Sequence, residues 1–133
     1  MVQPSLRDEA ISGIVKLLVH TKRETEAAVL FLGWFCSRRG RATKGDVSRF
    51  ADQLAFGERG FRYGRTTFYR YVLKTFIDHG LIGMESEIDQ DSRRVVKVYK
   101  RIIQPAKGRR PSGPSLLYNA HLLAERWNVL FGG

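Results

Sequence analysis

The sequence of 133 residues has little of what several classes of protein require. Its single cysteine, Cys36, excludes an internal disulfide, and the apolar residues around it indicate a small buried side chain. No apolar run approaches the roughly 20 residues that cross a membrane, and the first residues lack the basic-then-apolar pattern of a secretion signal. We therefore expect no membrane association and a cytoplasmic location.

Catalytic and metal-binding patterns are also scarce. The three histidines, His20, His79 and His121, lie far apart, and neither they nor Cys36 have the spacing of metal ligands. No phosphate-binding P-loop is present in the sequence. We therefore expect that the protein is not an enzyme and that it binds no metal, cofactor or small-molecule ligand. A phosphate-handling enzyme is the most distant alternative.

The sequence has an excess of positive charge, and this excess lies in one segment of the chain. The chain carries 23 basic and 13 acidic residues, and 18 of the basic but only 8 of the acidic residues lie between positions 38 and 110. A surface that binds a polyanion explains such segregation, whereas charge that only keeps a protein soluble would be spread along the chain. A merely solvated basic surface is the alternative.

The apolar periodicity and the turn residues predict a mainly α fold with a small β-hairpin, an α+β class, in a single domain over 1–133 with its core in 22–103. Thr21 with Glu24, and Thr43 with Asp46, have the spacing of a capping box at a helix start. A Gly-rich loop is expected at 55–64, and a basic Pro/Gly-rich linker at 104–113. The expected helices span 6–19, 22–38, 44–55, 65–79 and 114–130, and the expected strands span 81–88 and 93–103.

The helix expected at 65–79 has two different faces. At 100° per residue one stripe is apolar, and it consists of Tyr69, Val72, Leu73 and Phe76. The opposite face consists of Tyr63, Thr67, Arg70, Tyr71 and Lys74. Arginine suits the acceptor edge of guanine, threonine suits a thymine methyl or a phosphate, and lysine and tyrosine suit phosphate oxygens. This face is therefore a candidate for insertion into a DNA groove.

The order of elements and three segments resemble a winged helix-turn-helix domain with extra N- and C-terminal helices. The segments are ATKGDV at 42–47, TFYR at 67–70 and LKTFIDHGLI at 73–82. The resemblance implies that helix 65–79 enters the major groove of DNA and that hairpin 81–103 is the wing. The candidate DNA-binding residues are Lys44, Arg62, Tyr63, Arg65, Thr66, Thr67, Arg70, Tyr71, Lys74, Arg93, Arg94 and Lys97.

Two features depart from the family pattern. The loop between the two motif helices is longer than the usual turn of about 3–4 residues. The wing tip carries Asp89 and Asp91, which a phosphate would repel.

We interpret the chain as a double-stranded DNA-binding protein, first as a sequence-specific transcriptional regulator associated with the nucleoid. The alternatives are a sequence-neutral chromatin or chromosome-maintenance protein and a winged-helix protein-interaction adaptor. The apolar stripes of the first and last helices pack on each other within one chain or across a two-fold axis, and we favour a homodimer.

Overall fold

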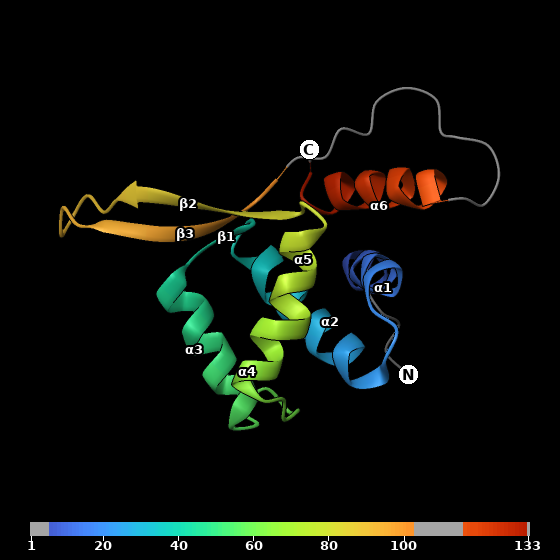
Figure 1. Ribbon diagram of the computed structural model, residues 1–133, viewed down its shortest axis with the longest axis horizontal. Helices are drawn as coiled ribbons and strands as arrows, with labels where there is room; N and C mark the ends of the chain where they lie inside the picture. The colour runs from blue at the N-terminus through green and yellow to red at the C-terminus, as the bar shows by residue number, and fades with distance from the viewer. Residues whose placement is uncertain (1–5, 103–115, 133) are drawn as a thin grey trace.

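The computed structural model describes residues 6–102 and 116–132, which form a mainly helical α+β structure (Figure 1). The sheet lies across one end of the helices, and hairpin β2–β3 extends past α3. The elements are α1 (Leu6–Leu18), α2 (Lys22–Ser37), β1 (Arg41–Thr43), α3 (Lys44–Ala55), α4 (Arg65–Thr67), η1 (Phe68–Leu73), α5 (Lys74–Asp78), β2 (Ile82–Ile88), β3 (Val95–Arg101) and α6 (Leu116–Leu130).

The expected helices and hairpin are present, but the sheet contains a strand that the sequence did not predict. Strand β1 pairs antiparallel with β3, so the strand order is β1-β3-β2. Arg39 and Gly40 have positive φ values of 60° and 73° and turn the chain from α2 into this strand. Three residues are too few to show an alternating pattern, and the partner strand lies far along the chain. The expected linker at 104–113 falls outside the described residues.

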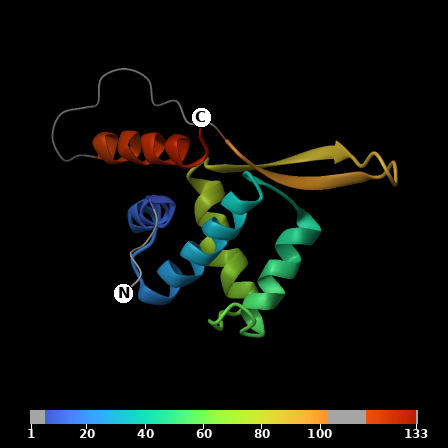
Figure 2. The ribbon, with the colours of Figure 1, turned by 180° about the vertical axis from the view of Figure 1, so that it is seen from behind.

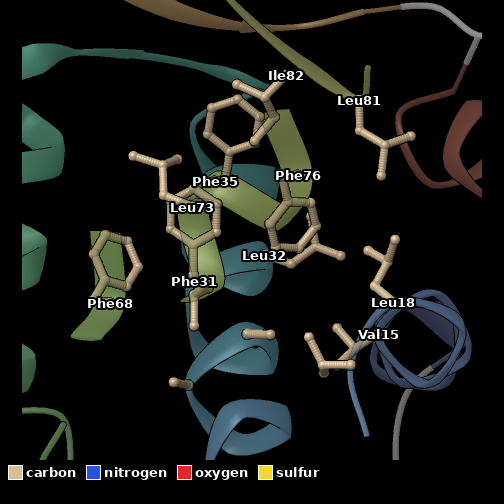
Figure 3. Close-up of a cluster of buried hydrophobic side chains, with 14 of the residues drawn as sticks. Val15, Leu18, Phe31, Leu32, Phe35, Phe68, Leu73, Phe76, Leu81 and Ile82 are labelled. Carbon is tan, nitrogen blue, oxygen red and sulfur yellow. The ribbon is translucent and has the colours of Figure 1, made fainter. Parts of the chain in front are cut away.

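The core is built around the aromatic ring of Phe31 on α2. Its centroid lies 5.4–5.7 Å from those of four other buried rings, which belong to Phe35, Phe50, Phe68 and Phe76. Figure 3 shows the rings from α2, η1 and α5 converging, with Val15 and Leu18 reaching in from α1, and Phe50 belongs to α3. Helix α2 is therefore central, although its residues Val29, Leu30 and Trp34 stay partly exposed.

The helix predicted at 65–79 is continuous over Arg65–Asp78 but contains a π-helical segment, η1. The N–H of Lys74 donates to the carbonyl of Tyr69, five residues earlier, instead of four. A π turn holds more residues than an α turn, so the helix rotates less per residue than the 100° assumed from sequence. Phe68 is fully buried, and Tyr69 is only partly buried at the edge of the core.

Helices α1 and α6 lie side by side, as the two opposite views agree (Figure 2). Leu123 and Trp127 of α6 belong to the same core cluster as Ile14 of α1, and the indole N–H of Trp127 donates to the carbonyl of Ile102 at 2.9 Å. The apolar stripe of α6 is thus packed within one chain. None of the helices in the described part of the chain is long and apolar enough to cross a membrane.

Candidate nucleic-acid interface

The candidate helix is fixed at its start by Arg65. Its guanidinium donates to the backbone carbonyl and the hydroxyl of Ser48, at 3.0 and 2.8 Å, and to the carboxylate of Asp52 at 2.8 Å. The same guanidinium lies 5.3 Å from the centroid of the Tyr69 ring. Arg65 therefore ties the candidate helix to α3, and its charge is already paired within the chain.

The next turns of the helix carry exposed polar side chains. Thr66, Arg70, Tyr71 and Lys74 are exposed, and Thr67 is half-buried. The guanidinium of Arg70 lies 5.6 Å from the centroid of the Tyr71 ring and makes no ion pair with any described residue. Lys74 is 3.9 Å from the carboxylate of Asp78, which is a loose exposed pair. Arg70 is thus oriented by an aromatic ring while its charge stays available.

Tyr63 does not lie on this face, which corrects the sequence-based prediction. Its side chain is only 4% exposed, it stacks on Phe61 at 6.0 Å, and its N–H donates to the carbonyl of Leu54 at 3.0 Å. Burial, followed by the negative charge of Glu24, raises the pKa of its hydroxyl. The helix begins only at Arg65, so a helical projection does not apply to Tyr63. This tyrosine therefore anchors the loop to the core.

The other two candidates near the helix lie at opposite ends of it. Lys44 is exposed at the first position of α3, close to the sheet, whereas Arg62 is exposed in the loop that precedes α4 (Figure 1). The Arg62 carbonyl accepts a hydrogen bond from Arg23 at 2.8 Å, while its side chain packs along Gly57. The two cations therefore come from other elements than Arg70, which lies on η1.

Hairpin β2–β3 separates its charges between its two faces. Residues opposite each other in an antiparallel ladder point to the same face. Lys97 and its partner Ser86 share the face on which Ala42, Ile82 and Tyr99 are buried against the helices.

The acids of the hairpin lie on the other face. There the amine of Lys100 is 3.2 Å from the carboxylate of Glu85, and Glu87 pairs with both Lys100 and Arg41. Hydrogen bonds from Lys100 and then from Arg41 hold the pKa of Glu87 below its usual range. The helix-side face of the hairpin therefore presents Lys97 without a neighbouring acid from either strand.

The tip of the hairpin uses one of its two aspartates to build its own turn. The carboxylate of Asp89 accepts from the hydroxyl of Ser92 at 2.8 Å and from the N–H of Asp91 at 3.3 Å, and these two bonds lower its pKa. The N–H of Arg93 donates to the carbonyl of Asp89 at 2.7 Å, with Arg93 at a φ of 56°. Both Arg93 and Arg94 are exposed, and neither makes an ion pair with a described residue.

A groove of about 410 Å³ runs beside the exposed face of the helix. Arg70, Tyr71 and Lys74 form one wall, and residues at the α1–α2 corner, among them His20 and Glu24, form the other. The sequence offered no signal for the second wall, because its residues meet the helix only through tertiary packing.

Within the described residues no three histidine, cysteine or acidic side chains are grouped so that they could hold a metal ion. No family model matches the sequence, and it matches neither a curated protein nor a solved structure.

Proposed function

We propose that this protein binds double-stranded DNA as a winged helix-turn-helix protein, with helix 65–78 in the major groove and hairpin β2–β3 as the wing. The order of α2, α3, the basic helix and the hairpin supports this proposal. The observation that carries it is the separation of cations. Arg70, Lys97, Arg93 and Arg94 are exposed without acidic partners in the described chain, whereas Arg65 and Arg41 are paired with acids.

Sequence-specific binding is the first choice because the exposed face of the helix is chemically mixed. Arg70 stacks on Tyr71, and Thr66 and Thr67 precede them on the same helix. An arginine held by a neighbouring ring suits the paired acceptors of guanine, and threonine methyl groups suit thymine. A protein that contacts only phosphates would gain nothing from this mixture. A transcriptional regulator associated with the nucleoid is therefore the role we propose.

A sequence-neutral chromosomal protein is the second candidate, and the wing favours it. Lys97, Arg93 and Arg94 are cations without neighbouring base-reading amides, so their contacts would be to phosphates or groove edges. In that case the affinity for DNA would depend steeply on salt and little on sequence. An adaptor that binds another protein is the third candidate, and no observation favours it.

The test is selection of bound sequences from a random duplex pool at two salt concentrations. An enriched motif supports the regulator, and tight binding without a motif but with a steep salt dependence supports the sequence-neutral protein. Absence of binding at low salt would contradict both. The matched control is Arg41→Ala, because Arg41 is exposed and basic but pairs with Glu87 on the other face of the hairpin. It should bind the pool like the wild type.

The homodimer expected from sequence stays a prediction. Two copies on an inverted repeat would place their recognition helices about 34 Å apart. Because the stripe of α6 is packed against α1 in the same chain, a dimer would need another surface. The spacing of half-sites in the selected motif, together with the mass of the complex, tests this prediction.

A further inference from the structure

Two exposed apolar residues stand opposite each other at the outer end of the wing. Ile88 is 67% exposed and Val95 is 71% exposed, and they are partners in the last pair of the β2–β3 ladder. Most other isoleucines and valines in the described chain are buried or half-buried. These two apolar side chains on a projecting hairpin do not pack into the core, so their exposure indicates another role, such as contact with a ligand.

The pair faces the side on which the helices lie. It shares its sheet face with Ser86 and Lys97, and closer to the body the same face buries Ile82 and Tyr99 against the helices. Hairpin β2–β3 overhangs the helical layer, as Figure 1 shows. A ligand that lies along this face of the hairpin would thus meet Ile88 and Val95.

Cations surround this apolar pair. Arg94 precedes Val95 directly, Arg93 lies one residue further into the turn, and Lys97 is the nearest charged residue on the same strand face. Of the acids nearby, Glu87 is turned to the opposite face and paired, and the carboxylate of Asp89 is engaged in the turn, so Asp91 is the exposed acid that remains.

This combination suits the minor groove of DNA. Its walls are the apolar C–H surfaces of the sugars, and its rims carry phosphates that attract arginine and lysine. An apolar patch meant for another protein would not require three cations around it. The hydrogen bonds of the Asp89 turn hold the tip in one shape, which lowers the entropy lost when it is inserted.

We infer that Ile88 and Val95 form an apolar wedge that enters the minor groove and bends the duplex at a flexible base step. The inference rests on the proposed DNA binding and adds a deformation of the DNA to it. Inserted apolar side chains partly unstack a base step and kink the duplex by about 20–90°. Pyrimidine–purine steps such as TA unstack most easily, so the wedge would prefer them.

The experiment uses the full chain and a duplex of about 25 base pairs from the selected pool, of the length over which bending is measurable. Dyes at the two ends report bending by energy transfer, and 2-aminopurine beside each TA or CA step reports unstacking. The variant is Ile88→Thr with Val95→Thr, because threonine keeps the β-branched shape that the strands favour. The control is Val129→Thr, since Val129 is 75% exposed on α6.

We expect the wild type and the control to shorten the end-to-end distance and to raise the 2-aminopurine signal. The double variant should bind with an affinity within about tenfold, corresponding to roughly 1.4 kcal/mol, and leave the duplex straight. Ile88→Val, which stays apolar, should restore most of the bend.

Three outcomes would overturn the inference. If the wild type binds and the duplex stays straight, the wedge is wrong and the proposed DNA binding stands. If the double variant bends the duplex as the wild type does, other residues cause the bend. If the wild type does not bind any duplex, the proposed function fails and the wedge fails with it.

Discussion

The two arginines of the candidate helix differ in the contacts that their side chains make. Arg65 and Arg70 differ by five positions, yet Arg65 makes hydrogen bonds to Ser48 and Asp52, whereas the one contact of the Arg70 guanidinium with a described side chain is with the ring of Tyr71. A guanidinium that is already bonded within the chain would have to give up those bonds to reach DNA. Arg65 therefore positions the helix, and Arg70 is the arginine available for base contact.

Replacing Arg70 by alanine should weaken binding to a selected site by about 1–3 kcal/mol and relax the preference at one base pair. The physical reason is the loss of a bidentate contact to guanine. Titration by fluorescence anisotropy on the selected duplex and on single-base variants measures both effects. An equal loss on every duplex would instead make Arg70 a phosphate contact.

Lys97→Ala should act differently, because Lys97 lies on the wing face without neighbouring acids. Its removal should weaken binding uniformly across sequences and reduce the salt slope by about one unit. Measurement of the affinity at several salt concentrations gives the slope. Arg41→Ala is the matched control, and a slope unchanged by Lys97→Ala would remove Lys97 from the interface.

Comparison of Tyr63 with Arg70 shows how far side-chain placement can be predicted from sequence. Arg70, Tyr71 and Lys74 are exposed as the helical projection predicts, but Tyr63 is buried. This difference has a local cause, since the helix begins only at Arg65 and a helical projection does not extend back to Tyr63. Apolar periodicity alone does not locate the start of the helix.

Among the elements, helix α3 begins as its sequence predicts. The Thr43 hydroxyl accepts from the N–H of Asp46, and the Asp46 carboxylate accepts from the N–H of Thr43, both at 3.1 Å. Burial alone would raise the pKa of Asp46. The hydrogen bonds from Thr43 and the charges of Arg38 and Arg49 together outweigh burial and lower the pKa.

This lowered pKa predicts an acid-sensitive helix start. Because the folded pKa lies below the unfolded value of about 3.9, the carboxylate of Asp46 stabilises the fold above that value. Its contribution is lost as the pH falls through the folded pKa. Asp46→Asn should therefore lower the free energy of unfolding at pH 7 and make its decline below about pH 4 shallower.

Urea denaturation at several pH values between 7 and 3 measures this difference. Glu58→Gln is the control, because its exposed side chain makes no hydrogen bond in the described structure. If Asp46→Asn and the wild type lost stability in parallel on acidification, the cap would not be the origin of the acid sensitivity.

Two glycines, one at the end of the candidate helix and one in α3, should respond in opposite ways to replacement by alanine. Gly80 has a φ of 69°, and the N–H groups of Gly80 and Leu81 donate to the carbonyls of Ile77 and Phe76, which is a Schellman motif. Gly80→Ala should cost about 1–2 kcal/mol through backbone strain, since no atom lies close to the added methyl group. Thermal denaturation measures the loss.

Gly45→Ala is the matched substitution in α3, where the φ is helical and the added methyl group meets only the Thr43 hydroxyl at 3.8 Å. It should stabilise the protein by about 0.5–1 kcal/mol because alanine favours the helix. Equal destabilisation by both substitutions would contradict the assignment of strain to Gly80.

At the scale of the whole molecule, the sequence indicates the basic middle segment but not how its charges are arranged. The acids Glu85 and Glu87 are close in sequence to Lys97, and they point away from it because the ladder fixes their face. Their neutralisation involves Arg41, which reaches Glu87 from strand β1. Since that strand was not predictable, neither was the separation of free and paired cations.

The packing of α6 ties the end of the sheet to the helices and predicts how the protein unfolds. Trp127 is fully buried, lies 4.7 Å from the Phe131 ring and donates to the carbonyl of Ile102. Trp127→Ala should cost about 3–5 kcal/mol, because truncation of a buried tryptophan leaves a cavity. This loss is a large part of a typical stability of about 5–15 kcal/mol.

Trp127→Phe keeps an aromatic ring in the core and should lower the free energy of unfolding less than Trp127→Ala does. It is therefore the variant with which the packing of α6 can be tested in a folded protein. If α6 packs on α1 of its own chain and the chain is a monomer, the melting temperatures of the wild type and of Trp127→Phe should not depend on protein concentration. If α6 instead packs on a second copy, both melting temperatures should rise with concentration. Melting curves over a hundredfold range of concentration show whether folding is coupled to association, and the mass measured by sedimentation at each end shows whether the chain is a monomer.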